Sequence, residues 1–238
     1  MIVKLYLAPG SGDPAIKALL ELQSRALRPT HFSSSETRRE GSLASARGFE
    51  AFRKRNPSGY FLVAPGGLYD VVLREAPTLT LFSERPDGPV DASDIESLFV
   101  ACAACSSFGF AATTEEYHHR NRVQKGLPGN SSLEAWVGRD LTRYVPGLYW
   151  RTLLREELCT QHDVPLERIR AEFETRPLDP TAWLIRCPGA PSDWRENAPR
   201  VDRLCAELPG VFSKGEVEPA LAGLATYREI SHVLNRWP

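Results

Sequence analysis

The sequence predicts an α+β fold, with an antiparallel or mixed sheet, or sheets, and helices packed on one face. Two observations support this prediction. Runs of β-type residues follow one another closely at 60–64, 68–74 and 78–82, as in a meander of antiparallel strands. A separate apolar stripe at helical spacing covers 91–105. Two similar α/β halves are the other arrangement that these patterns allow.

The N-terminal part of the chain is expected to hold a strand, two helices and a loop. Residues 2–7 alternate as a strand. Asp13 is placed to cap the first helix, whose apolar periodicity continues until Pro29 ends it. The polar residues 33–42 predict a loop, and 43–55 predict a second helix. The side chains expected to point inward from that second helix are Phe49 and Phe52.

Short turns join the three β-type runs. The first two are separated by Pro65-Gly66-Gly67, which is a hairpin signal. The run at 68–74 is mostly apolar and suits a central position in a sheet. The run at 78–82 alternates with period two, so we expect it to bury one face.

The helix at 91–105 is the clearest one in the sequence. Ser93 and Glu96 have the spacing of a capping box. A further strand is expected at 108–112, and the residues 113–116 are typical of the start of another helix.

The C-terminal part of the chain is expected to be richer in helices. The residues 125–132 predict a flexible connector, and a helix over 151–158 is expected directly after Pro146-Gly147. The runs 169–173 and 183–187 predict two strands. Two further helices are expected at 200–208 and 216–238.

We predict a single domain over 1–238. The connector at 125–132 is short for separating two independent cores. The subdivision kept as an alternative is a β-rich half, 1–112, and a helix-rich half, 113–238.

Charge and composition argue against several classes of function. Lys and Arg number 29 against 30 Asp and Glu, a net charge of −1, so no overall field attracts a nucleic acid or an anionic membrane. No apolar window is long enough to span a bilayer, and the first apolar run is too short for a signal peptide. The five Cys are scattered and odd in number, which favours reduced, mostly buried thiols. We therefore expect a cytoplasmic protein that binds neither nucleic acid nor a membrane.

The densest cluster of titratable residues runs from Glu115 to His119. On a helix, Glu115 and His118 are three residues apart, as are Glu116 and His119, so both pairs could face a common ion. Zinc needs further ligands from other elements, and no second pair at metal spacing occurs. The interpretation that we favour is a solvated helix with charged pairs, without a metal or cofactor.

Other motifs point to structure and not to catalysis. Cys102 and Cys105 have the spacing of a redox pair, but both fall late in a helix on its apolar stripe, so core packing is expected. The turn at 9–12 lacks the Lys of a phosphate loop. No nucleophile elbow occurs. The sequence therefore predicts no catalytic residue.

The stretch Trp136–Leu154 holds two Trp, two Tyr and several charges. Trp, Tyr and Arg are the residue types most enriched at binding hot spots. Trp150 adjoins an apolar helical face and is expected to be buried. The residues before the Pro-Gly break that are expected at the surface are Trp136, Arg139, Asp140 and Arg143.

The combination of GRDL with YVPGLYW and a following leucine-bearing helix resembles bacterial immunity proteins of polymorphic-toxin and type VI secretion systems. The resemblance rests on Pro146-Gly147-Leu148-Tyr149-Trp150 and on the general layout of 90–210. It implies an α+β inhibitor that binds one cognate toxin effector protein and blocks it without catalysis.

The resemblance leads us to place the partner-binding surface on 115–149. Acidic residues there would suit a toxin with a basic cleft. The alternative, from another class of function, is a small metal-dependent or acid/base enzyme that uses the 115–119 cluster. The predicted partner-binding residues are Glu115, Glu116, Trp136, Arg139, Asp140, Arg143 and Tyr144.

Overall fold

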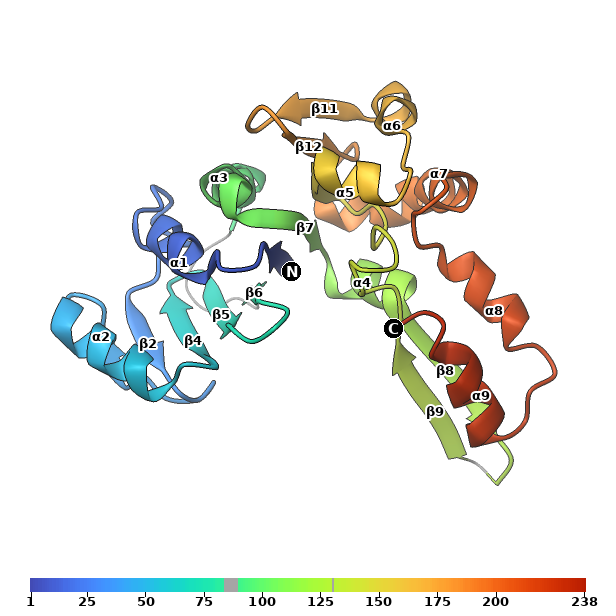
Figure 1. Cartoon of the computed structure of the whole chain (residues 1–238), viewed down its shortest axis with the longest axis horizontal. Helices are drawn as coiled ribbons and strands as arrows, with labels where there is room; N and C mark the ends of the chain where they lie inside the picture. Colours follow the sequence, from blue (N-terminus) through green and yellow to red (C-terminus); the bar gives the residue numbers. More distant parts are fainter. Residues whose placement is uncertain (84–89, 130) are drawn as a thin grey trace. The chain divides into compact units, whose positions relative to one another are not determined.

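The computed structural model describes residues 1–83, 90–129 and 131–238. The α+β fold is confirmed: these residues form a ten-stranded sheet, a two-stranded sheet and nine α-helices (Figure 1). Asn130, which belongs to the predicted connector at 125–132, lies outside the described residues.

The chain divides into two compact units. Unit 1 comprises Met1–Ala111, Thr152–Arg155 and Arg176–Leu184. Unit 2 comprises Ala112–Arg151, Glu156–Thr175 and Ile185–Pro238. The single domain over 1–238 stays a prediction.

The large sheet has the strand order β11-β12-β10-β7-β1-β6-β5-β4-β2-β3. Neighbours from β1 through β6, β5, β4 and β2 to β3 pair antiparallel. The three β-type runs of the predicted meander are confirmed as β4, β5 and β6. The strands are β1 (Ile2–Leu7), β2 (His31–Ser33), β3 (Gly41–Ser42), β4 (Gly59–Ala64), β5 (Gly67–Val72), β6 (Thr78–Phe82), β7 (Ser106–Ala112), β10 (Arg151–Arg155), β11 (Glu174–Pro177) and β12 (Ala182–Arg186).

One face of the sheet in unit 1 is a continuous apolar surface. The register sets Leu62 opposite Tyr69, Tyr69 opposite Leu81 and Leu81 opposite Val3. Cross-strand partners share a face, and all four of these side chains are buried. Their burial away from water is the main stabilising contribution of this sheet.

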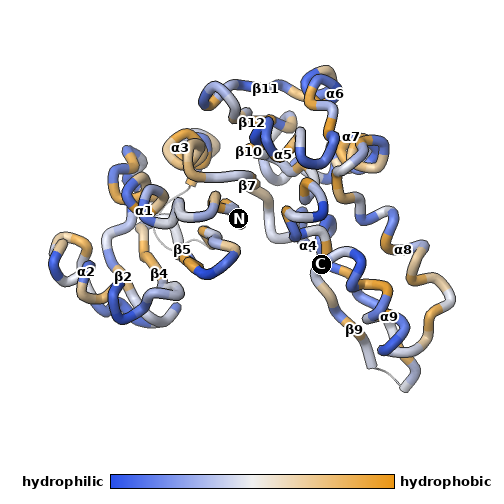
Figure 2. Tube along the Cα trace, in the orientation of Figure 1, coloured by the Kyte–Doolittle hydropathy of each residue, from blue (hydrophilic) through white to orange (hydrophobic). Residues whose placement is uncertain are grey.

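Helices of unit 1 supply the apolar residues that meet this core. They are α1 (Gly12–Leu20), α2 (Ala46–Arg55) and α3 (Ala92–Cys102). As predicted, α2 buries Phe49 and Phe52, and the Phe52 ring centroid lies 4.6 Å from that of Phe32 on β2. Figure 2 shows apolar residues recurring along α3. The buried residues of that helix are Ile95, Leu98, Phe99 and Cys102.

Two helix starts in unit 1 differ from the predictions. Helix α1 begins at Gly12, so Asp13 lies in its first turn and not at the cap. It ends at Leu20, well before Pro29, and the chain turns there, with Leu22 N donating to Leu19 O. The capping box of α3 is formed by Asp91 and Asp94.

The predicted capping pair of α3 and the predicted loop at 33–42 were also wrong in part. Ser93 Oγ donates to the Asp91 carboxylate at 2.7 Å, so it supports the true cap, which lies two residues earlier than expected. Residues 41–42 form β3, a short edge strand that pairs with β2. The backbone of residues 41–42 pairs with that of β2, and this pairing forms the strand although its side chains are not those typical of strands.

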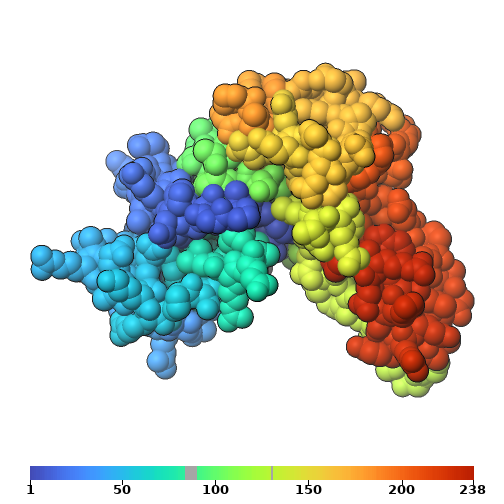
Figure 3. Space-filling model, in the orientation of Figure 1, coloured from blue at the N-terminus to red at the C-terminus, as the bar shows by residue number. Residues whose placement is uncertain are grey.

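Unit 2 contains a β-hairpin against which C-terminal helices pack. Strand β8 (Arg122–Leu127) pairs antiparallel with β9 (Ser131–Trp136). In Figure 3 the C-terminal segment, in red, covers part of the yellow-green hairpin region. The helices of this unit are α4 (Thr114–Asn121), α5 (Glu156–Gln161), α6 (Leu166–Glu172), α7 (Trp194–Glu207), α8 (Val217–Ala220) and α9 (Tyr227–Leu234).

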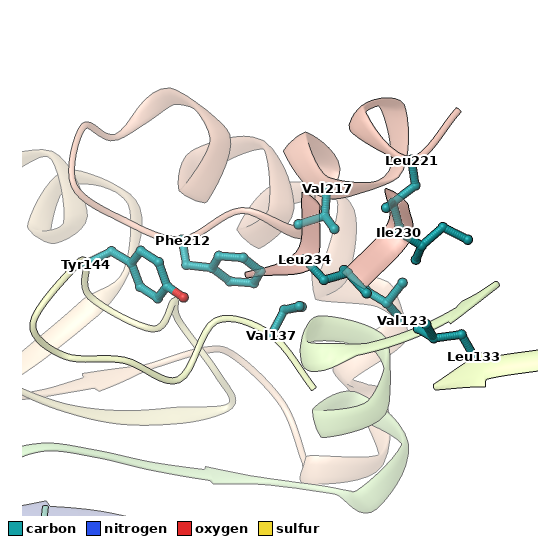
Figure 4. Packing of buried hydrophobic residues seen from close by; sticks show 9 residues of the cluster. All are labelled: Val123, Leu133, Val137, Tyr144, Phe212, Val217, Leu221, Ile230 and Leu234. Carbon is teal, nitrogen blue, oxygen red and sulfur yellow. The ribbon is translucent and has the colours of Figure 1, made fainter. Parts of the chain in front are cut away.

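The hairpin and the last two helices share one hydrophobic cluster (Figure 4). Each strand contributes one buried residue, and α9 contributes two at helical spacing. Tyr144 and Phe212 extend the cluster, with ring centroids 5.3 Å apart. The buried members are Val123, Leu133, Val137, Tyr144, Phe212, Val217, Leu221, Ile230 and Leu234.

Several predictions for the C-terminal part were wrong. The connector at 125–132 lies within the β8–β9 hairpin. The helix expected from 151 begins only at Glu156, because residues 151–155 pair as β10 inside the large sheet. The run 169–173 lies mostly in α6, where Ile169 is the buried residue.

The terminal helix expected over 216–238 is two helices. Gly223 separates α8 from α9 with a φ of 76°, a left-handed conformation that ends a helix readily. The helix predicted at 200–208 begins earlier, at Trp194, with Pro199 inside it. No helix among the described residues is long and apolar enough to cross a membrane.

Candidate functional site

Helix α4 carries the titratable cluster at 115–119. Its side chains point to separate partners: exposed Glu115 pairs with Arg195 at 2.8 Å, and His119 Nε2 lies 2.9 Å from Asp202 Oδ2. Glu116 is 1% exposed. The predicted solvated helix is therefore wrong for Glu116. Across the part of the chain that the structure describes, no three His, Cys, Asp or Glu side chains are grouped to hold a metal ion.

Four residues of α4, β9 and the loop that follows form what we term the aromatic–arginine face: Tyr117, His118, Trp136 and Arg139. Tyr117 stacks on Trp136, with ring centroids 5.1 Å apart and an interplanar angle of 21°. His118 meets Trp136 edge-on at 5.3 Å. The three rings are half-buried and Arg139 is exposed. Burial raises the pKa of Tyr117, and the nearby charge of Arg139 opposes that shift.

Gly138 sets the position of Arg139 beside these rings. Its φ is 72°, and a Cβ there would lie 2.2 Å from the Phe212 ring, so only glycine fits. The next two backbone N–H groups, of Arg139 and Asp140, donate to Pro238 O at 2.9 and 3.2 Å. The backbone that presents Arg139 is thus held on both sides.

The remaining predicted residues of the loop hold the C-terminal segment. Arg143 Nη1 donates to Asn235 O at 3.2 Å, and Tyr144 Oη donates to Pro238 O at 2.7 Å. The Asp140 carboxylate accepts from the backbone N–H and the hydroxyl of Thr142. Burial raises the pKa of Tyr144 to about 12. The polar groups of these residues are therefore engaged within the chain.

Glu116 and Arg120 form a buried ion pair one helical turn apart. Arg120 Nε donates to Glu116 Oε1 at 3.2 Å, and Arg120 Nη1 donates to Asp202 Oδ1 at 2.6 Å. Trp150 N also donates to Glu116 Oε1 at 3.1 Å. Burial raises the pKa of Glu116, opposed by the charge of Arg120. A buried carboxylate with these donors serves packing and orientation and has little surface for a partner.

The segment that carries the resemblance, 146–150, is internal. Tyr149 Oη donates to Asn121 Oδ1 at 2.9 Å, and Trp150 Nε1 donates to Gly189 O at 3.0 Å. Both rings are buried, as expected for Trp150. This segment ties α4 to the rest of unit 2.

Comparison with protein-family models gives no match, and comparison with curated proteins gives none. The membership in an immunity-protein family that 144–150 suggests stays a prediction. The function proposed below is therefore argued from the geometry of unit 2.

Two depressions adjoin α4 in unit 2. A cavity of about 260 Å³ is lined by His119, Arg120, Asp202 and Lys214, among others. An open groove of about 570 Å³ lies beside it and is lined by residues that include Glu115, His118 and Arg195. His118 belongs both to this groove and to the aromatic–arginine face. The groove and the face therefore form one connected surface.

The sequence prediction missed part of this surface. Tyr117, His118, Arg122 and Lys125 fall within the predicted surface at 115–149, but none of them was named as a partner-binding residue. The Pro128-Gly129 pair between the hairpin strands is a turn signal. A hairpin with its turn at Pro128-Gly129 pairs Arg122 with Trp136. Because α4 ends at Asn121, directly before Arg122, this pairing places Trp136 next to α4.

Proposed function

We propose that this chain is an immunity protein that binds and neutralises a cognate secreted bacterial toxin without catalysis. The observation that supports this proposal is the aromatic–arginine face. Tyr117, Trp136 and Arg139, the residue types that dominate binding hot spots, gather there on one partly exposed surface.

The geometry of the face favours binding of a protein partner. The rings of Tyr117 and Trp136 are stacked on each other, which restricts their side-chain rotamers in the free protein. Little conformational entropy is therefore lost when a partner covers them. Gly138 fixes the backbone beside Arg139. Glu115 of α4 and Arg195 of α7 are each 65% exposed and lie with His118 in the adjoining groove, where they can supply specificity.

Capture from the native host tests this proposal. The tagged chain should retain one stoichiometric protein, and co-expression of the chain should relieve the toxicity of that protein. We expect Trp136→Ala to weaken binding by about 2 kcal/mol, roughly thirtyfold in Kd, because the residue would be a central anchor. Arg139→Ala should weaken it as well.

The matched control is Tyr227→Ala on α9, since Tyr227 is 67% exposed and lies outside the face. It should leave the Kd unchanged. Binding that survives both Trp136→Ala and Arg139→Ala would remove the face from the interface, and the absence of any stoichiometric partner would refute the function.

A second proposal, an acid/base enzyme, has one favourable observation. His119 and Asp202 are paired and line the 260 Å³ cavity, as a general base and its orienting carboxylate are paired in hydrolases. On this proposal His119→Ala abolishes turnover of some small substrate while the fold is retained. Loss of toxin neutralisation with Trp136→Ala, but not with His119→Ala, would favour the immunity function over the enzyme.

A further inference from the structure

The groove beside the aromatic–arginine face is built from several elements of unit 2. Glu115 and His118 reach it from α4, Arg122 and Lys125 from β8, and Arg195 from α7. Its volume is about 570 Å³. It is large enough to receive several side chains of another protein, and through His118 it continues the face.

Positive charge predominates in the groove lining. Four cationic side chains, Arg122, Lys125, Arg195 and Lys214, stand against the carboxylates of Glu115 and Glu218. Both carboxylates already have a cation: Glu115 pairs with Arg195, and Glu218 lies 3.8 Å from Lys214.

The other two cations differ in their partners. Arg122 pairs with Glu134 of the neighbouring strand, a carboxylate outside the groove lining. Lys125 donates to a backbone oxygen, Leu221 O, at 2.9 Å, and has no carboxylate within ion-pair distance in the described chain. Among the four cations of the lining, Lys125 is therefore the one without a carboxylate partner in the described residues.

We infer that the groove receives an acidic segment of the protein partner, whose carboxylates meet Lys125 and the exposed guanidinium group of Arg195. This inference rests on the proposed partner-binding function. It reverses the charge expected of the partner from the sequence, because Glu116 is buried and Glu115 is matched by Arg195.

Charge neutralisation tests the inference. The full chain carrying Lys125→Gln and Arg195→Gln is titrated against the captured partner at low and at high salt. We expect binding to weaken about tenfold or more at low salt, mainly through slower association, and the difference to shrink at high salt. The matched control is Arg228→Gln with Arg236→Gln, two exposed positions outside the groove with the same change in net charge.

The outcomes separate the inference from the function on which it rests. If the Lys125→Gln, Arg195→Gln variant binds the partner as well as the wild type does, while Trp136→Ala still weakens binding, no acidic segment binds in the groove. The proposed immunity function is unaffected by that result. If affinity capture yields no protein partner at all, both the acidic segment and the immunity function are overturned. If only nuclease-sensitive material is captured, the groove binds a nucleic acid, and the proposed protein segment is overturned. If the double variant melts early, Arg195→Gln alone provides the test, because that side chain is 65% exposed.

Discussion

At the scale of single residues, the charges of α4 divide into buried and exposed groups. Glu116 and Arg120 are enclosed, and they connect the helix to Trp150 and Asp202. Glu115, one position away, faces solvent with Arg195. Neighbouring residues on a helix point about 100° apart, so one short charged run supplies both an internal link and a surface.

Removal of the Glu116 carboxylate should strongly destabilise the chain. Glu116→Ala leaves the Arg120 guanidinium with a single carboxylate and orphans the Trp150 N–H, which should cost about 3–5 kcal/mol of the free energy of unfolding. Glu116→Gln keeps an acceptor and should cost less. Urea unfolding followed by tryptophan fluorescence measures both, with Glu115→Ala as an exposed control expected to change little. Equal stability of Glu116→Ala and Glu115→Ala would contradict the buried link.

The Asp202 carboxylate should make stability depend on pH in the acid range. Burial raises its pKa, but the hydrogen bond from His119 and the charge of Arg120 outweigh burial and leave the pKa below the ordinary 3.8. A lowered folded-state pKa means that its stabilising contribution is complete above pH 3.8 and is lost as the pH falls through the folded-state value.

Asp202→Asn provides the measurement for that dependence. The difference in free energy of unfolding between the wild type and Asp202→Asn should be constant near neutrality and should narrow below about pH 4. Glu116 titrates in both proteins, so its effect largely cancels in the difference. A difference that grows toward acid pH would contradict the lowered pKa.

At the scale of elements, the β8–β9 hairpin is stabilised by its packing against α9. A lone two-stranded hairpin is marginally stable in water, and here Val123 and Leu133 pack in the same cluster as Ile230 and Leu234 (Figure 4). Helix α9 begins with a capping box between Thr226 and Glu229, which holds its register. The hairpin that carries Trp136 therefore depends on residues about a hundred positions later in the chain.

Truncation of Ile230 should loosen this element. Ile230 is 0% exposed, so Ile230→Ala should cost about 2–5 kcal/mol, through lost burial and a cavity. His232→Ala on the exposed side of the same helix is the control and should change stability little. Hydrogen exchange of the β8 and β9 amides should rise in the first variant only; unchanged protection would show that α9 does not stabilise the hairpin.

At the scale of the whole molecule, the chain passes repeatedly between its two units. Segments 152–155 and 176–184 belong to unit 1, although the sequence around them belongs to unit 2. They supply most of β10 and parts of β11 and β12 to the ten-stranded sheet. Such non-local strands form only after the chain has closed long loops, which favours slow folding.

The cysteines provide a probe of the folded state as a whole. All five are free and buried: Cys102, Cys105, Cys159, Cys187 and Cys205. Burial raises the pKa of Cys159 to about 11 and that of Cys187 to about 12, which leaves little thiolate at neutral pH. We expect an aromatic disulfide reagent to react slowly with the native protein and with all five thiols in concentrated guanidinium chloride. Rapid native reaction of Cys187 would contradict its burial.

The sequence alone determined the elements whose pattern is local and strong. The strands at 2–7, 60–64 and 78–82, the apolar face of α3 and the start of α4 follow from periodicity and capping, which neighbouring residues specify. The same local signals identified Trp136 and Arg139 as residues of binding type. They could not separate buried Glu116 from exposed Glu115, because both look alike in a charged run.

Only the tertiary structure decided the rest. Residues 151–155 have helix-forming character, yet they pair as β10 because the neighbouring strands of the sheet bury Leu153 and Leu154. The aromatic–arginine face exists because the hairpin register brings Trp136 beside α4, and the groove exists because α7 and the segment at 214–218 lie beside β8. These contacts join residues far apart in the sequence, and no local pattern specifies which distant partner will supply the burial.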